Sequence, residues 1–268
     1  MVNDLLLDNK KMKYFKFGNG NKIIIMIPGL SIKSVMEYES SIINDYNSFT
    51  KDYTIYCFDR LENPDNSYDI ESMCDYIYYA IKELNLNDVY LYGASEGGMI
   101  SMMLAIKYPS IYKKIAVVST SANVTKENFE AINNWITLAK NNKKEELMLD
   151  FMEKIYPKKL YLKSIDLCKN IANTITKEEL DRFIINASAI KGFNILDQLI
   201  LIDKPFLMVG GKLDNLLGIN PIIEAKMHNK NIKTHIFEGY GHALYDLAPE
   251  FKNILLNFFN EKEWFYEL

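Results

Sequence analysis

Short runs of consecutive apolar residues recur along the chain, and they predict six strands. Most runs are rich in β-branched and aromatic residues and end at glycine, proline or a polar residue. The predicted strands span Lys22–Pro28, Tyr53–Asp59, Asp88–Gly93, Lys114–Ser119, Pro205–Gly211 and Lys233–Gly239. Because an uninterrupted apolar run has no polar face to turn to water, such strands are typical of a sheet that is covered on both sides.

Between these runs, apolar residues recur at spacings of three and four, which predicts amphipathic helices. One such stripe consists of Ile70, Met73, Ile77, Ile81 and Leu84. Another follows Pro249 and consists of Phe251, Ile254, Leu255, Phe258 and Phe259. Strands that alternate with helices predict a mostly parallel sheet with helices on both faces. The sequence therefore indicates an α/β fold.

Residues 123–196 interrupt this alternation, because they contain helical segments such as "ENFEAINNWITLAK" and no clear strand. We predict a helical cap here, inserted between the fourth and fifth predicted strands, with residues 1–122 and 197–268 forming the core domain. The cap is expected to fold over the carboxyl edge of the sheet, where open α/β sheets bind ligands. Four apolar cap residues either line a substrate pocket or form the cap's own core: Phe129, Trp135, Phe151 and Met152.

The composition is that of an ordinary globular protein and argues against several classes of function. The 268 residues are 49% hydrophobic and 25% charged, with a formal net charge of −4. This balance disfavours a nucleic-acid partner. No apolar run approaches the roughly 18 residues of a membrane span, and we find no signal-peptide pattern. Cys57, Cys74 and Cys168 have no metal-site spacing, so we expect reduced cysteines in a cytoplasmic protein.

Ser95 lies in the stretch "GASEGG", between a predicted strand and a helical pattern. A strand, a sharp glycine-flanked turn and a helix lift such a serine above the carboxyl ends of the strands, beside the unpaired amides that open the helix. This arrangement is the nucleophile elbow, G-x-S-x-G. The alternative is a serine that caps the helix beside glycines needed for packing. The motif together with its context favours a nucleophile.

A serine hydroxyl needs a base to act as a nucleophile, and the chain has three histidines. His242 follows "EGYG", at the end of the last predicted strand. His228 lies in a helical stretch, and His235 lies inside the last strand. Only His242 is well placed to reach the carboxyl edge of the sheet, so it is the predicted base.

The histidine needs a carboxylate that fixes its tautomer. Asp214, in "GGKLD", follows the fifth predicted strand and is the predicted partner. Asp203 precedes that strand and therefore belongs to the opposite edge of the sheet. Asp246 is expected to cap the last helix. The predicted catalytic residues are thus Ser95, Asp214 and His242.

This chain order, with the motifs "GASEGG", "GGKLD" and "GYGHA", resembles that of the α/β-hydrolase superfamily over nearly the whole chain. The resemblance implies an eight-stranded, mostly parallel sheet that begins with an antiparallel hairpin, here near "YFKFGNG". It places the helical cap after the sixth strand. It also implies an oxyanion hole whose donors are the backbone amides of Leu30 and Glu96.

Two departures from the family pattern stand out. In "IPGLS", Pro28 replaces the usual histidine, but a backbone donor does not need that side chain. In "FDRLENPDNSYDI", Asp59 and Arg60 match the family motif while its glycines are missing, and we interpret this loop as structural. Glu96 sets an acidic side chain beside a site where negative charge develops. We expect a basic or hydrogen-bonding partner for Glu96, with Arg60 the first candidate.

The sequence therefore predicts a serine hydrolase that cleaves an ester or thioester of a small-to-medium acyl substrate through an acyl-enzyme on Ser95. No metal or organic cofactor is required. Other chemistry on the same three residues stays open: C–C bond or amide hydrolysis, aminopeptidase action, acyl transfer or cofactor-free haloperoxidase activity. A ligand-binding homologue without activity is a further alternative. The sequence does not define the assembly, for which a homodimer stays open.

Overall fold

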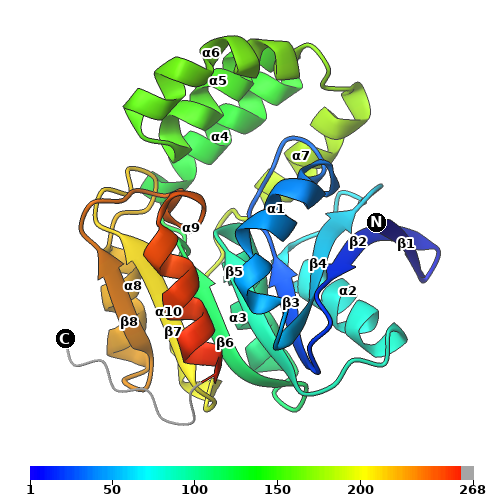
Figure 1. Cartoon of the computed structure of the whole chain (residues 1–268). Helices are drawn as coiled ribbons and strands as arrows, with labels where there is room; N and C mark the ends of the chain where they lie inside the picture. Colours follow the sequence, from blue (N-terminus) through cyan, green and yellow to red (C-terminus); the bar gives the residue numbers. More distant parts are fainter. Residues whose placement is uncertain (261–268) are drawn as a thin grey trace.

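The six predicted strands form the parallel part of an eight-stranded sheet (Figure 1). The computed structural model describes residues 1–260; residues 261–268, which the sequence assigned to the core domain, lie outside the described residues. The parallel strands are β3 (Lys22–Ile27), β4 (Tyr53–Leu61), β5 (Val89–Ala94), β6 (Tyr112–Val118), β7 (Phe206–Gly211) and β8 (Lys233–Phe237). Their carboxyl ends therefore lie at one edge of the sheet, as the sequence predicted.

An antiparallel hairpin supplies the other two strands, β1 (Val2–Leu7) and β2 (Lys10–Phe17). Asp8 and Asn9 form its turn with φ angles of 46° and 64°, and such positive angles are those of a two-residue type I′ hairpin. Strand β2 pairs with β4, again antiparallel, so the sheet order is β1-β2-β4-β3-β5-β6-β7-β8.

The sequence indicated this hairpin only faintly, and β1 itself was missed. β1 is an edge strand that buries Leu5 and Leu7 but exposes Leu6. It therefore offers no uninterrupted apolar run. The turn at Asp8 and Asn9 is the local signal that reveals it.

Alternate residues of the central strands enter two separate cores, one on each face of the sheet. In β3, Ile25 and Ile27 belong to one core, whereas Ile24 and Met26 belong to the other. A strand between two cores needs apolar residues at every position, which is why the sequence shows continuous runs here.

Helices cover both faces, as predicted (Figure 1). The helices that pack into the first core are α2 (Ile70–Glu83), α3 (Glu96–Lys107) and α8 (Asn220–His228). Those that pack into the second core are α1 (Glu39–Asp45), α9 (Leu244–Leu247) and α10 (Pro249–Asn260). Most of the two predicted apolar stripes is buried, in α2 and α10 respectively. None of the helices in the described residues is long and apolar enough to cross a membrane.

Four consecutive helices follow β6 and form what we call the four-helix insert: α4 (Lys126–Lys140), α5 (Lys144–Ile155), α6 (Lys158–Ala172) and α7 (Lys177–Ala189). A single bridge between Asn123 and Asn194 joins the two ends of the insert. The chain then passes through a 3₁₀ helix, Leu196–Leu201, before it enters β7.

The four-helix insert lies at the carboxyl edge of the sheet, at the top of Figure 1. The amide of Ala243, beyond the end of β8, donates a hydrogen bond to the carbonyl of Ile155 in α5 (3.2 Å). From α7, Arg182 forms an ion pair with Asp59 near the end of β4. The insert thus contacts the carboxyl end of β4 and the loop that follows β8.

Candidate active site

Ser95 lies at the junction of β5 and α3, and its backbone is strained. Its φ of 51° and ψ of −120° fall in a region that residues with a side chain rarely adopt. The carbonyl of Ser95 accepts hydrogen bonds from the amide of Gly98 (2.9 Å) and from the hydroxyl of Thr120 (2.6 Å). These contacts hold the turn, and the Ser95 side chain remains partly exposed.

The glycines of "GASEGG" permit this turn because backbone segments pass very close to them. A Cβ atom on Gly97 would lie 1.9 Å from the carbonyl oxygen of Ile27, at the end of β3. A Cβ atom on Gly93 would lie 2.2 Å from the carbonyl oxygen of Gly97. Only glycine fits at both positions, so the predicted nucleophile elbow is present as a backbone structure.

The structure brings Ser95, His242 and Asp214 into one hydrogen-bonded chain, although they come from three different loops. The Nε2 atom of His242 lies 3.1 Å from Oγ of Ser95. Its Nδ1 atom lies 2.8 Å from Oδ2 of Asp214. His242 and Asp214 are both buried. The geometry is that of a nucleophile, a base and a carboxylate that orients the base.

Asp214 is held in its ionised form by its surroundings. Burial disfavours the charge, but His242 and two backbone amides outweigh it and lower the pKa of this carboxyl. The amides belong to Leu216 and Leu217, which donate to Oδ1 at 2.8 and 3.0 Å. Because an ionised carboxylate only accepts hydrogen bonds, Nδ1 of His242 carries the proton, and Nε2 is free to accept one from Ser95.

Two hydroxyl side chains at the end of β6 brace this arrangement, and the sequence reasoning missed both. Ser119 donates to the carbonyl of His242 (2.7 Å), and Thr120 donates to the carbonyl of Ser95 (2.6 Å). Both side chains are buried. The run of small polar residues "STS" directly after an apolar strand was the available signal, since it places them at the carboxyl edge.

The turn after β3 lies directly against Ser95. A Cβ atom on Gly29 would be 3.0 Å from Cβ of Ser95 and 3.7 Å from its Oγ. The next residue in this turn is Leu30, and the residue after Ser95 is Glu96, the first of α3. The two residues predicted to supply oxyanion donors therefore belong to the two turns that meet at Ser95.

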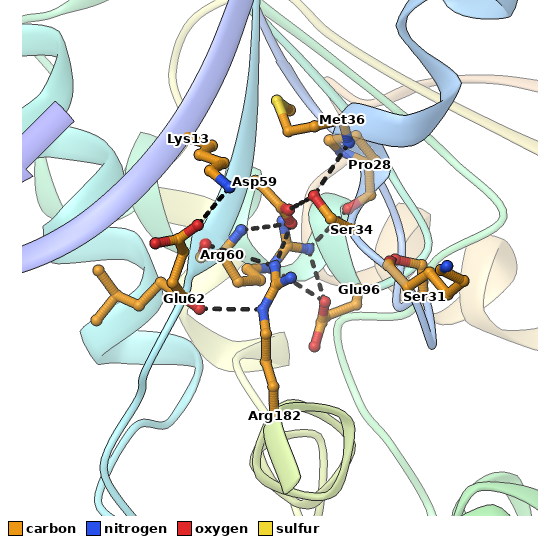
Figure 2. Close-up of polar contacts among 12 residues, drawn as sticks. Lys13, Pro28, Ser31, Ser34, Met36, Asp59, Arg60, Glu62, Glu96 and Arg182 are labelled. Carbon is orange, nitrogen blue, oxygen red and sulfur yellow. Dashed lines mark hydrogen bonds and ion pairs between the residues drawn. The ribbon is translucent and has the colours of Figure 1, made fainter. Parts of the chain in front are cut away.

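The expected partner of Glu96 is confirmed. Both Nε and Nη2 of Arg60 donate to Oε2 of Glu96, at 3.1 and 2.6 Å. Arg60 Nη2 also donates to the carbonyl of Pro28 (2.7 Å), so one guanidinium contacts both turns, as Figure 2 shows. Glu96 is only 1% exposed. Burial raises the pKa of its carboxyl, and the positive charge of Arg60 offsets only part of this rise.

A pocket of about 460 Å³ opens beside these turns. It is bounded by Gly29 and Leu30 on one side and by α5 and α6 of the four-helix insert on the other. Of the four apolar residues singled out from the sequence, Phe151 and Met152 line this pocket, whereas Phe129 and Trp135 do not.

Trp135 instead packs inside the insert. Its ring lies 4.7 Å from that of Phe151, and its Nε1 donates to Asp150 at 2.7 Å.

The remaining candidates are not members of this hydrogen-bonded chain. His228 ends α8, where its Nδ1 contacts the carbonyl of Glu224 (2.9 Å), and His235 lies inside β8. Asp203 precedes β7, at the opposite edge. The prediction for Asp246 was wrong: it lies inside the short helix α9, and its carboxylate accepts a hydrogen bond from Tyr156 of the insert (2.8 Å) rather than capping α10.

The three cysteines are free and buried.

A family model of the α/β hydrolase fold matches residues 22–249. The chain belongs to the α/β hydrolase family. None of the curated proteins matches this α/β hydrolase at a significant level.

Solved structures of other α/β hydrolases have the same fold at low sequence identity. MGS-M2, an α/β hydrolase enzyme from a Medee basin deep-sea metagenome library, is 18% identical (99% of this chain, 100% of that chain, TM-score 0.87). The enol-lactonase from Burkholderia xenovorans LB400 is 15% identical (97% and 100%, TM-score 0.83). The esterase EaEST from Exiguobacterium antarcticum is 18% identical (96% and 98%, TM-score 0.78). At these identities the likeness concerns the fold alone.

Proposed function

We propose that this α/β hydrolase is a serine hydrolase that cleaves carboxylic esters or thioesters through an acyl-enzyme on Ser95. The observation that carries the proposal is the hydrogen-bonded chain from Ser95 through His242 to Asp214, beside the two turns that contain Leu30 and Glu96. A hydroxyl in contact with a neutral imidazole is an activated nucleophile.

In this proposal, Oγ of Ser95 attacks the substrate carbonyl while Nε2 of His242 takes its proton. Asp214 stabilises the imidazolium that forms, because its carboxylate accepts the hydrogen bond of Nδ1. The tetrahedral intermediate places its negative oxygen between the amides of Leu30 and Glu96. Such fixed donors are worth roughly 100- to 1,000-fold in rate each.

The second half of the reaction reverses the proton path. His242 gives its proton to the leaving alcohol or thiol, and the acyl group remains on Ser95. Water then enters, gives its proton to Nε2 and attacks the ester carbonyl, which releases the acid and restores the serine. No step needs a metal or an organic cofactor.

The pocket beside the elbow supports the proposed substrate class. Its wall on the insert side is largely apolar and includes Met148, Phe151, Met152 and Ile155. An apolar wall of this kind favours a hydrocarbon chain of small to medium length over a charged group. We propose that the four-helix insert acts as a cap that covers the substrate. The names of two similar structures, an esterase and a lactonase, are consistent with ester chemistry.

The test is hydrolysis of p-nitrophenyl esters of graded chain length by the wild type and by Ser95→Ala. The wild type should hydrolyse at least one of them, and Ser95→Ala should lose on the order of a million-fold in kcat, as serine proteases without their nucleophile do. The exposed Ser40→Ala serves as the matched control and should keep full activity. A wild type that binds these esters but never turns them over would instead be a binding protein.

A further inference from the structure

Four charged side chains alternate in sign between the four-helix insert and the nucleophile elbow (Figure 2). Their order is Arg182, Asp59, Arg60 and Glu96, and we call them the charge chain. Arg182 pairs with Asp59, and Arg60 pairs with Glu96. All four side chains are at most 14% exposed. Charges removed from water to this extent interact strongly, so each member needs its partner.

The charge chain contacts both turns of the proposed oxyanion hole. Arg60 binds the carbonyl of Pro28, immediately before Gly29, and its partner Glu96 carries the other proposed donor amide. Oδ1 of Asp59 accepts a hydrogen bond from the amide of Arg60 (2.8 Å). Oδ2 of Asp59 accepts a second one from the hydroxyl of Ser34 (2.5 Å). Asp59 thus orients the residue that joins the two turns.

On the side of the insert, α7 supplies two residues one helical turn apart, Arg182 and Asn186. Arg182 also donates to the carbonyl of Leu61 (3.0 Å). Oδ1 of Asn186 and Oε1 of Glu96 are both buried and have no hydrogen-bond partner among the described residues. Both residues line one cavity of about 10 Å³, which is the size of a single water molecule. A water there has two protons to donate to these two acceptors.

We propose that Arg182 is a positioning residue through which the docking of α7 maintains the charge balance and the spacing of the two oxyanion-hole turns. This inference rests on the proposed function. With Arg182 in place, the charge chain sums to zero. Without it, Asp59 is an unpaired buried anion and competes with Glu96 for Arg60. The extra negative charge then opposes the oxyanion that forms beside Glu96.

The expected effect of Arg182→Met is a fall in kcat on p-nitrophenyl acetate of roughly 10- to 50-fold, the size that one unpaired charge near the reacting atoms produces. KM for this small ester should stay within about 2-fold. The double variant Asp59→Asn/Arg182→Met removes one charge of each sign, so it should recover most of the lost kcat. Lys177→Met is the matched control. It removes an exposed ion pair with Asp181 from the same helix and should leave kcat unchanged.

Two results would overturn the inference. Arg182→Met with at least half of the wild-type kcat means that Arg182 positions nothing at the site. A double variant as slow as Arg182→Met means that the loss comes from packing and not from charge. If Arg182→Met fails to fold, Arg182→Lys and the double variant provide the test instead. Because lysine keeps the positive charge, kcat of Arg182→Lys should stay within about 5-fold of the wild-type value.

A second readout separates this inference from the proposed function. Hydrogen exchange of the α7 amides should rise in Arg182→Met and stay unchanged in Lys177→Met, whether or not the protein hydrolyses esters. A wild type without any esterase activity would refute the proposed function. Unchanged exchange of α7 in Arg182→Met would refute the docking role of Arg182 even in an active enzyme.

Discussion

The hydroxyl of Ser119 donates a hydrogen bond to the backbone carbonyl of His242, so the end of β6 holds the loop that carries the proposed base. The two residues are 123 positions apart in the chain. Ser119 itself has a φ of 48°, in the left-handed region that favours glycine. The hydrogen bond to His242 helps to offset the conformational cost of this backbone angle at Ser119.

Replacing Ser119 by alanine should therefore slow the reaction. The carbonyl of His242 loses its buried donor, which costs about 1 kcal/mol of stability. The imidazole then has more freedom beside Ser95, and kcat should fall roughly 3- to 10-fold because alignment is lost. Ser121→Ala is the control, since its hydroxyl forms hydrogen bonds within its own loop, with the backbone of Asn123. An equal fall of kcat in both variants would contradict the specific role of Ser119.

The second prediction concerns the pair of Arg60 and Glu96. Glu96→Gln should change kcat/KM on neutral esters by less than about 10-fold, because Arg60 already compensates the charge. Arg60→Met should destabilise the protein by about 3 kcal/mol and slow the reaction, because it leaves a buried carboxylate unpaired. The double variant should recover part of both losses. Thermal unfolding and steady-state kinetics measure the two effects. A hundredfold gain in Glu96→Gln would mean that the charge is not compensated.

The pair of Arg60 and Glu96 is a contact that the sequence alone could predict. Asp59 ends one predicted strand and Arg60 follows it directly, whereas Glu96 follows another predicted strand. Because parallel strands end at one edge of the sheet, their pairing was predictable, although β3 lies between β4 and β5. The same logic placed Ser95, Asp214 and His242 together. Each of these residues carries a local signal, either flanking glycines or a position directly after an apolar run.

The contacts that could not be predicted involve residues without a local sequence signal. Arg182 lies in an amphipathic helix of the insert, and its partner Asp59 is 123 residues away. Nothing in the local sequence distinguishes it from a solvated arginine. Trp135 and Phe151 illustrate the same limit within the insert. Both occupy apolar positions of helices, yet only Phe151 lines the pocket, because the packing of the helices on one another decides which face is exposed.

The pocket gives the third prediction. Ile171 of α6 lines the pocket, so Ile171→Trp should reduce its volume. Hydrolysis of long-chain p-nitrophenyl esters should fall roughly 10-fold in kcat/KM, while that of the acetate should stay within about 2-fold. Leu162→Trp changes an exposed position of the same helix and should have no effect. If Ile171→Trp slows all chain lengths equally, the pocket does not hold the acyl chain.

The fourth prediction uses the pH dependence of stability. The pKa of Asp214 is lowered in the folded protein, mainly because His242 and two amides outweigh the opposing effect of burial. A carboxyl with a lowered folded-state pKa stabilises the fold above its unfolded pKa, which is about 3.9, and this contribution is lost as the pH falls through the folded value.

The free energies of unfolding of the wild type and of Asp214→Asn should therefore differ at pH 5, above the unfolded-state pKa of the carboxyl. The difference should shrink below about pH 4, where the Asp214 carboxyl of the unfolded wild type takes up its proton before that of the folded protein does. Denaturant unfolding at each pH provides the measurement, and the exposed Asp166→Asn provides the reference. A difference that grows on acidification would show that the folded pKa of Asp214 is raised rather than lowered.

The proposed mechanism requires Ser95 to become covalently modified. Mass spectrometry after brief treatment with a fluorophosphonate tests it most directly, because only an activated serine reacts quickly. The account predicts a single adduct on the wild type, on the peptide that contains Ser95. It predicts no adduct on Ser95→Ala and strongly slowed labelling of His242→Gln, with His235→Gln labelled at the wild-type rate. An unlabelled wild type, or an equally fast adduct on Ser95→Ala, would contradict the account.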